Sequence, residues 1–504
     1  MATLWVWITG SLVAIVCFLL FFYVYSTWNY GIFKKMGVNG PQPSFLFGNH
    51  MVFAKHGFKK ADMMLWKEYG DVFGYFTGRT PSIVIADTEI LQEILVKQFN
   101  NFTDRAVLRG FSGAMNENLS AQQGKVWKSS RSILSPTFTT GKLRKMDPLI
   151  KEAADSLVLH IKKRINECNE VDFAWLFGCY TLDVIASTAF GIKVDSQRDP
   201  NDKFVRMASK ILAIKVNSPY LTLAFVLPIL MRPLSKLFNI TVLDKEATEF
   251  FTNEILKVLN SSEPSIQKDY VDFIHLMMEA HNEDPDNTDG RRGLTSKEII
   301  ANCLLFFFAG YETTAASLSF LAYNLALNPD IQQKMYEEIV SVLGEEEPGY
   351  DNTGKLQYME MCIHETMRMY PASPRTDRIC VRETEVKGLK IPEGMQIAVP
   401  IYILHHNEKL WQDPEKFDPE RFSAENKAKM KPCQFMPFGF GPRICIGKRL
   451  AITEMKIALA KLLREFILVK CDKTKIPPKE LQTGLIKPED MWLKVQLRSS
   501  EESD

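Results

Sequence analysis

The N-terminal end of the chain is a continuous apolar run followed by a basic flank. Residues Leu4 to Tyr25 are almost wholly apolar, and the first charged side chains are Lys34 and Lys35. A run of this length can cross a bilayer as a helix of about 20 residues. A cleaved signal peptide is the alternative, but no basic residue precedes the run, whereas Trp28 and the two lysines follow it. The pattern predicts a retained anchor, with the N-terminus outside and the rest of the chain in the cytosol.

A second apolar segment, in the middle of the chain, predicts a long helix. Thr295 and Glu298 have the spacing of a capping box, and Asn328–Pro329 ends the helix that follows at about Leu327. The residues from Ile299 to Tyr311 are apolar on nearly every side but too few for a membrane span. We therefore expect a central helix of the protein core.

Polar residues interrupt this helix between Ala309 and Thr314. An acid such as Glu312 is costly in an apolar segment unless it is solvated or paired, and Gly310 weakens a helix by about 1 kcal/mol relative to alanine. The combination predicts a locally opened helix with a polar notch beside Thr313. The alternative is a threonine hydroxyl that bonds its own helix backbone.

A third helix is predicted between Leu450 and Phe466, where apolar residues recur at helical spacing. The pattern predicts one buried face, and the charged residues set among the apolar ones are Glu454, Lys456, Lys461 and Arg464.

The ten residues before this helix, Phe438 to Gly447, contain three glycines and one proline. This composition excludes a regular helix or strand and predicts a tight loop whose backbone can approach a flat group. Cys445 then lies at or just before a helix N-terminus, where unpaired N–H groups and the helix dipole favour an anion. These surroundings favour a thiolate, and a buried structural cysteine is the alternative.

Other segments predict a small sheet and several breaks. Val72–Phe76 and Ser82–Ala86 have the pattern of short strands, and Gly40–Pro43 is a stiff, non-helical connector. Between Ile211 and Phe238 the chain is apolar, but three prolines exclude a second membrane span. Core helices are one interpretation of that region. Residues Glu279 to Arg292 are polar and acidic, as in a mobile surface loop.

Composition narrows the class of protein. A chain of 504 residues exceeds one ordinary domain, yet no linker divides it into modules. The net charge of +1 argues against a nucleic-acid-binding protein. Nine cysteines, an odd number without the spacing of a disulfide framework, indicate a reducing compartment. The predicted topology would leave unmodified the four glycosylation sequons, which begin at Asn101, Asn118, Asn239 and Asn260.

Two residue pairs have helical spacing. Trp127 and Arg131 lie four apart on one face, and Glu365 and Arg368 lie three apart. Alone, the first pair is compatible with a core-edge tryptophan beside a solvated arginine, and the second with a surface ion pair worth about 0.3 kcal/mol.

Together, these motifs resemble those of the cytochrome P450 family in content and order. The segment Phe438-x-x-Gly441-x-Arg443-x-Cys445-x-Gly447 is similar to the haem-binding loop of that family. Further similar motifs are Trp127-x-x-x-Arg131, Ala309-Gly310-x-Glu312-Thr313-Thr314, Glu365-x-x-Arg368 and Pro419-Glu420-Arg421-Phe422. The resemblance covers the whole chain. The motif at Ala309 and the segment from Pro371 to Cys380 look most like the animal microsomal group that oxidises steroids and drugs.

The resemblance implies a mainly α fold with a small β region, as one catalytic domain behind an N-terminal transmembrane helix. It implies haem b with Cys445 as the axial thiolate ligand of the iron, Phe438 beside the sulfur and Ala309 along the haem. Arg443 would bind a haem propionate, and arginine suits that task because its planar fork binds carboxylates bidentately. The other propionate candidates are Arg105, Trp127, Arg131 and Arg378.

The resemblance also implies roles around the haem. Thr313 would hydrogen-bond dioxygen or its water, and Glu312 would resupply protons from solvent. The residues expected to face the substrate are Phe111, Phe308, Ala309, Thr313, Ala372, Ser373 and Leu485. The expected pocket segments are Val107–Asn118, which contains Phe111, Lys203–Phe238, and Leu481–Ile486, which contains Leu485. Glu365, Arg368 and Arg421 would form a buried structural triad behind the haem. The helices between Ile211 and Phe238 would rest on the membrane over the substrate entrance.

The implied reaction is monooxygenation of a lipophilic substrate, such as a steroid, xenobiotic or fatty acid, with dioxygen and NADPH. Electrons would come from a separate NADPH-dependent flavoprotein reductase, because no Gly-x-Gly-x-x-Gly follows a strand here. Cytochrome b5 is a further expected partner. A basic docking face is expected from Lys125, Lys128, Arg131, Lys142, Arg144, Lys145, Lys448 and Arg449. A merely solvated basic face is the alternative.

The expected location is the endoplasmic reticulum membrane, with a single span and a cytosolic catalytic domain. The expected divisions are an anchor at 1–28, a proline-rich linker at 29–45 and a catalytic domain at 46–504. Two alternatives differ in chemistry. A haem-thiolate isomerase similar to thromboxane synthase would rearrange a peroxide without a reductase, and a haem sensor would have no catalytic role. Neither needs proton delivery, so the Glu312–Thr313 pair speaks against both.

Overall fold

The computed structural model describes residues 2–106, 113–165, 168–199, 202–212, 219–227, 231, 233–234, 237–238, 243–260, 273–279, 293–481 and 484–498. The chain folds into two compact units, each made of three separate stretches. The first unit comprises Met1–Ala106, Lys215–Ile240 and Arg375–Ile403, and the second comprises Val107–Ile214, Thr241–Pro374 and Leu404–Asp504.

The first unit holds the N-terminal helix and a four-stranded sheet. Its elements are α1 (Ala2–Thr27), α2 (Ile32–Met36), α3 (His50–Tyr69), β1 (Val72–Thr77), β2 (Thr80–Ile85), α4 (Thr88–Gln92), η1 (Glu93–Lys97), η2 (Phe99–Asn101), α9 (Pro219–Val226), β4 (Thr376–Ile379), β5 (Thr384–Val386), β6 (Leu389–Ile391) and β7 (Gln396–Val399). The strand order is β1-β2-β7-β4, with β2 and β7 parallel and the outer pairs antiparallel, while β5 and β6 form a hairpin. The two strands predicted from the sequence are confirmed as β1 and β2.

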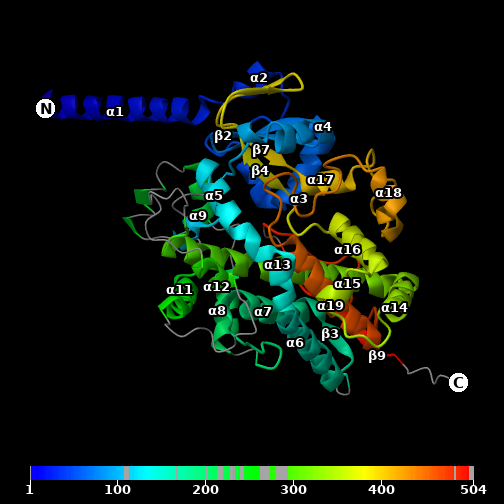
Figure 1. The fold of residues 1–504 in the computed structure, drawn as a ribbon. Helices are drawn as coiled ribbons and strands as arrows, with labels where there is room; N and C mark the ends of the chain where they lie inside the picture. The colour runs from blue at the N-terminus through cyan, green and yellow to red at the C-terminus, as the bar shows by residue number, and fades with distance from the viewer. Residues whose placement is uncertain are drawn as a thin grey trace. The chain divides into compact units, whose positions relative to one another are not determined.

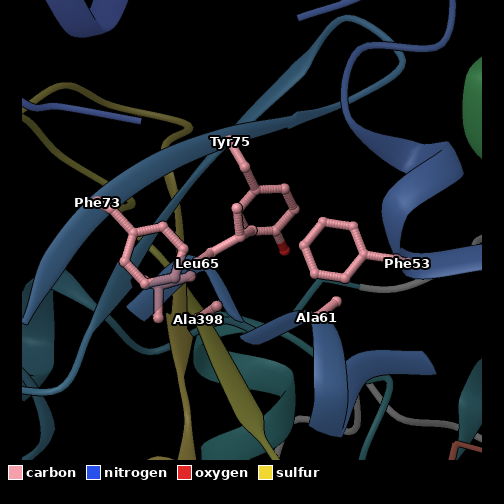
Figure 2. Packing of buried hydrophobic residues seen from close by; sticks show 7 residues of the cluster. Phe53, Ala61, Leu65, Phe73, Tyr75 and Ala398 are labelled. Atoms are coloured by element: carbon pink, nitrogen blue, oxygen red, sulfur yellow. The ribbon is translucent and has the colours of Figure 1, made fainter. Parts of the chain in front are cut away.

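The core of the first unit lies between α3 and the sheet. Figure 2 shows Phe73 and Tyr75 of β1 gathered with Phe53 of α3 and Ala398 of β7, and the Phe53 and Tyr75 ring centres are 4.7 Å apart. Arg375 is held by an ion pair with the buried Asp62 of α3 and by a hydrogen bond to the Tyr75 hydroxyl at 2.9 Å.

The connector Gly40–Pro43 is non-helical, as predicted, and it packs directly against β1. The Gly74 N–H donates to the Asn39 carbonyl at 2.8 Å. A side chain at Gly40 would meet the Gly74 carbonyl oxygen at 1.9 Å, so only glycine allows this approach. Phe33 of α2 is buried against Phe76, which makes the segment after the anchor part of the folded unit.

The second unit is mainly helical. Its elements are η3 (Gly113–Glu117), α5 (Gly124–Leu134), η4 (Ser135–Phe138), α6 (Thr140–Arg164), β3 (Glu170–Asp172), α7 (Phe173–Phe190), α8 (Lys203–Leu212), α11 (Lys245–Asn260), α12 (Phe273–Met278), α13 (Ser296–Leu327), α14 (Pro329–Leu343), α15 (Tyr350–Thr353), α16 (Gln357–Met369), η5 (Pro419–Phe422), α18 (Ala424–Ala428), α19 (Lys448–Glu465), β8 (Phe466–Val469) and β9 (Trp492–Leu497). Helix α17 (Ile401–His406) spans the boundary between the units. The strands form an antiparallel sheet of order β3-β9-β8.

Helix α13 is the central helix predicted from the sequence. The Thr295 hydroxyl accepts from the Glu298 N–H and the Glu298 carboxylate accepts from the Thr295 N–H, which completes the capping box. The helix packs along α7, and α7 and α19 pack on α6, as Figure 1 shows for this unit. Its C-terminal half, from Thr314 to Ala326, is buried.

The prediction that α19 has a single buried face is wrong. Glu454, Lys456 and Lys461 are all buried, like the apolar residues of the helix. They are tolerated because partners reach them from distant segments. Lys456 donates to Glu360 at 2.8 Å and to two backbone carbonyls, and Lys461 is paired with Asp155 and Glu347.

Three helices among the described residues are long and apolar enough to cross a membrane, namely Leu4–Met36, Phe173–Phe190 and Ser296–Leu327. The most apolar stretch of the first is wholly exposed, whereas that of the second is 89% buried and that of the third 56% buried. Helices α7 and α13 pack on each other, and the exposure of the first helix is consistent with a membrane anchor. The apolar region after Ile211 contains the end of α8 and the short α9, and most positions from 228 to 242, like 280–292, lie outside the described residues.

Candidate functional site

The loop before α19 presents a cysteine at an exposed position. Gly439 and Gly441 have φ of 76° and 75°, a left-handed conformation that favours glycine. The Cys445 N–H donates to the Phe438 carbonyl at 2.9 Å, which closes the loop. The Cys445 side chain is exposed and precedes the first residue of α19, Lys448, by three positions. The predicted loop and its place at a helix N-terminus are therefore observed, and the alternative of a buried cysteine is not.

Arg443 is brought together with Trp127 of α5. Its guanidinium lies 4.3 Å from the centre of the Trp127 ring and donates to the Gln122 carbonyl at 2.7 Å. Both side chains are buried, whereas Arg131, one turn further along α5, is half-buried. Two of the predicted propionate-binding groups thus lie in one stacked arrangement beside the Cys445 loop.

Helix α13 has a locally exposed face at the predicted notch. Ala309 is exposed and Phe308 and Thr313 are half-buried, although Phe306, Phe307 and Thr314 nearby are buried. The Thr313 hydroxyl donates to the Ala309 carbonyl at 2.6 Å. This is the backbone-bonded threonine that the sequence left open as an alternative.

The predicted opening of α13 is wrong, because the helix continues through Gly310 without interruption. Gly310 serves close packing instead. A side chain there would meet Cδ1 of Ile185 on α7 at 2.8 Å, so glycine lets the two helices approach.

Glu312 is paired, as an acid in an apolar helix requires. Its carboxylate accepts from the ammonium of Lys487, and the two side chains are 15% and 21% exposed. Lys487 was not singled out from the sequence. No local pattern could have found it, because 175 positions separate the two residues.

The segment before β9 lies against one of the predicted substrate residues. The Ile486 N–H donates to the Ala372 carbonyl at 2.9 Å. This bond brings the segment that carries Leu485 next to Ala372. Leu485, Ala372 and Ser373 are all half-buried. Phe111, the remaining predicted pocket residue of this unit, lies outside the described residues.

Glu365, Arg368 and Arg421 lie together in a buried cluster. Arg368 donates to Glu365 from Nε at 2.7 Å and from Nη2 at 2.9 Å, and both side chains are fully buried. Arg421 Nε lies 3.3 Å from the same carboxylate. Arg368 also donates to the carbonyls of His405 and Pro414. Burial raises the pKa of Glu365, and the Arg368 guanidinium opposes that shift.

The two remaining propionate candidates belong to the first unit. Arg378 is a fully buried residue of β4, and Arg105 follows Asp104, whose carbonyl accepts from the Ile379 N–H at 2.7 Å. The Asp377 carboxylate accepts from the Ala106 N–H at 2.5 Å. These two bonds hold Arg105 and Arg378 on adjacent stretches of backbone.

Glu454 is a buried acid whose burial could not be predicted from the sequence. The Thr314 hydroxyl donates to its carboxyl, but burial dominates and raises the pKa of Glu454 from 4.5 to about 8. Its carbonyl accepts from the Tyr180 hydroxyl at 2.8 Å. The acid therefore lies where α19 meets α13, next to the residue that follows Thr313.

Glu454 should make stability fall as pH rises. Between about pH 5 and pH 8 the folded carboxyl keeps a proton that the unfolded chain has lost. Each rise of one pH unit then lowers the free energy of unfolding by about 1.4 kcal/mol. Glu454→Gln should remove this pH dependence. Between pH 5.5 and 7.5 the free energy of unfolding of the wild type should therefore fall by up to about 3 kcal/mol relative to that of the variant. Urea unfolding at both pH values measures it.

The matched control is Glu425→Gln, because the Glu425 side chain is 80% exposed. Its unfolding should follow the wild type at both pH values. Parallel pH profiles for the wild type and Glu454→Gln would contradict a protonated, buried Glu454.

The residues around the Cys445 loop fit a haem. A cysteine sulfur is a haem-iron ligand, and this one is exposed on a loop closed by two left-handed glycines. A Cβ added at Gly439 would meet no described atom within 4 Å, so a flat group can approach the backbone there. Arg443 supplies a fixed cation suited to a carboxylate such as a propionate. The donor set is therefore that of a thiolate-ligated haem.

Comparison with known proteins agrees with this chemistry. The family profile described as Cytochrome P450 matches residues 38–493. Cytochrome P450 3A28 of Bos taurus is 38% identical over 487 residues, which cover 96% of this chain and 94% of the relative. Cytochrome P450 3A41 of Mus musculus is 41% identical over 483 residues, or 95% of each protein, and cytochrome P450 3A2 of Rattus norvegicus is 40% identical with the same coverage. Similarity that extends from the connector to the last strand involves far more than the cysteine loop, and the chain therefore belongs to the cytochrome P450 family, close to its 3A subfamily.

Proposed function

We propose that this protein hydroxylates steroids, xenobiotics or fatty acids, with Cys445 as the iron ligand and Thr313 and Glu312 as the proton relay. The class of the reaction follows from the family: the protein is a haem-thiolate monooxygenase that uses electrons supplied by a reductase. The exposed thiol of Cys445 at the start of α19 is the observation that carries the residue assignment.

When bound, the haem activates dioxygen at its thiolate-ligated iron. The chain has to hold the haem, align the substrate and deliver protons. Cys445 supplies the ligand, and Arg443, stacked on Trp127, offers a cation to a propionate. Arg131, Arg105 and Arg378 are the further proposed propionate partners, and Phe438 is proposed to pack beside the sulfur.

Proton delivery is assigned to the exposed face of α13. A hydroxyl has one proton to donate and two lone pairs to accept. Thr313, which donates to the Ala309 carbonyl, can therefore accept a proton from one side while it passes one on by rotating. Glu312, next along the helix, is the proposed source because its carboxylate keeps some contact with solvent. Phe308, Ala309, Ala372, Ser373 and Leu485 are proposed to pack against the substrate.

Thr313→Ala should uncouple electron consumption from product formation. Alanine costs a helix little stability, so haem content and substrate-binding spectra should stay close to those of the wild type. Acid–base positioning is worth about 10²–10⁴-fold in rate. Product per NADPH should fall and hydrogen peroxide should rise, as measured together in a reductase-reconstituted assay.

Ser317→Ala is the matched control for this substitution. The Ser317 hydroxyl donates to the Thr313 carbonyl at 2.8 Å, which is the same kind of backbone bond one turn further along α13. It should leave the ratio of product to NADPH unchanged. Unchanged coupling in Thr313→Ala would remove the proposed relay from the mechanism.

The cellular setting is proposed from the same features. Helix α1 is apolar and exposed, which supports a single span in the endoplasmic reticulum membrane with residues 46–504 as a cytosolic catalytic domain. The anchor is then 1–28 and the connecting segment 29–45. The proposed docking face for the flavoprotein reductase, and for cytochrome b5, includes exposed Lys125, Lys128, Arg144, Lys145, Lys448 and Arg449 and half-buried Arg131 and Lys142. Arg144 is already paired with Asp351 at 2.8 Å.

A further inference from the structure

The ion pair between Glu312 and Lys487 joins two parts of the second unit that lie 175 positions apart in the sequence. Glu312 belongs to α13, whereas Lys487 belongs to the segment that leads into β9. Neither side chain is freely solvated, because only 15% of Glu312 and 21% of Lys487 is exposed. A pair at this depth holds both side chains in one place, since either charge alone would lack full hydration.

The backbone around Lys487 is fixed on both sides. The Leu481 N–H donates to the Lys487 carbonyl at 3.0 Å, and Glu480 and Pro488 form an antiparallel bridge. The Ile486 N–H donates to the Ala372 carbonyl at 2.9 Å, and the Ile486 side chain is buried. The segment is therefore a short loop tied to the chain at Ala372, and the Lys487 side chain ties it to α13.

We propose that Lys487 is a positioning residue, which holds the Glu312 carboxylate beside Thr313 and couples it to the loop that carries Leu485. The proposal rests on the proposed function, in which Glu312 supplies protons to Thr313 and Leu485 contacts the substrate. Leu485 is two residues from Lys487, so a substrate that displaces Leu485 also displaces the partner of Glu312. The coupling of electrons to product should then depend on the size of the substrate.

The structure offers a conservative replacement and a matched control. Lys487→Arg keeps the positive charge and should keep the pair, whereas Lys487→Gln and Glu312→Gln each remove it from one side. Lys479 is paired with Glu489 at 2.7 Å on the same stretch of chain, but its side chain is 65% exposed. Lys479→Gln therefore removes the same charge from a pair that should contribute little.

The first readout is hydrogen exchange of the amides from 484 to 490 in the full-length holoenzyme in lipid. Loss of the tie should increase local opening, so exchange should be about tenfold faster in Lys487→Gln and in Glu312→Gln. The double variant should be no faster than either single one, because both remove the same pair. Lys487→Arg and Lys479→Gln should exchange like the wild type. The proposed link between the loop and α13 would be wrong if the effects multiplied in the double variant, or if Lys487→Gln exchanged like the wild type.

The second readout is the ratio of hydrogen peroxide to NADPH with the reductase. It should rise about tenfold or more in Lys487→Gln and return towards the wild type in Lys487→Arg. A rise in Thr313→Ala and Glu312→Gln without one in Lys487→Gln would overturn the role of Lys487 alone. Unchanged ratios in Thr313→Ala and Glu312→Gln would instead overturn the proposed relay, and the role of Lys487 with it.

Discussion

Arg368→Ala is expected to destabilise the protein more than the loss of any surface ion pair. Arg368 and Glu365 have no exposed side-chain area, and the guanidinium makes two bonds to the carboxylate and three to backbone carbonyls. Removing it leaves the buried carboxylate with the Asp418 N–H, at 3.0 Å, and the more distant Arg421 as partners. Such a loss costs about 3–5 kcal/mol, against a total stability of about 5–15 kcal/mol for a typical domain. The urea midpoint and haem retention should both fall.

Two variants calibrate this result. Arg368→Lys keeps the charge but loses the bidentate geometry, so its stability should lie between those of the wild type and Arg368→Ala. Arg144→Ala removes an Arg–Asp pair whose side chains are 59% and 65% exposed, which should cost about 0–1 kcal/mol. If Arg368→Ala unfolded at the same urea concentration as Arg144→Ala, the buried cluster would have no structural role.

Cys445→Ser is expected to abolish the oxygenase activity. A serine hydroxyl is not a thiolate, and it lacks the electron donation that favours cleavage of the O–O bond. Even the loss of a group behind a metal ligand typically costs 10–100-fold in affinity or activity, so loss of the ligand itself should reduce turnover by at least about 100-fold. Haem content per protein measures the loss of haem affinity, and NADPH-dependent product formation measures the loss of turnover.

The serine variant should otherwise fold like the wild type. The Cys445 side chain is exposed and the loop is closed by the backbone bond from the Cys445 N–H to the Phe438 carbonyl, which serine retains. A similar far-ultraviolet circular dichroism spectrum is therefore expected. Wild-type turnover in Cys445→Ser would show that the iron ligand is another residue.

Local motifs could be predicted from the sequence because neighbouring residues make them. The capping box of Thr295 and Glu298 fixes the start of α13, and the glycines around Cys445 fix a loop in which two of them are left-handed. The strands β1 and β2 are short, mostly apolar runs that pair with each other across Gly78 and Arg79. In each case the bonds that form the element join residues close in the sequence.

Side-chain pairing across the fold could not be predicted, because it depends on partners far along the chain. Lys456 and Lys461 look like solvent-facing residues of an amphipathic helix, yet Glu360, Asp155 and Glu347 allow them to be buried. Lys487 could not be linked to Glu312 for the same reason.

Packing between helices could not be predicted from the sequence either. Gly310 suggested an opened helix, whereas the close approach of Ile185 from α7 accounts for it. The sequence cannot distinguish these two uses of a glycine, because the difference lies in what stands opposite it.

The assignment of Cys445 as the iron ligand is tested most directly by X-ray absorption at the iron edge of the haem-loaded protein. One sulfur atom is expected in the first coordination shell of the wild type and none in Cys445→Ser. Cys433→Ser is the control, because Cys433 is buried and burial raises the pKa of its thiol to about 12, which disfavours a thiolate. That variant should keep the sulfur ligand. An iron without sulfur in the wild type, or with sulfur still bound in Cys445→Ser, would contradict the assignment.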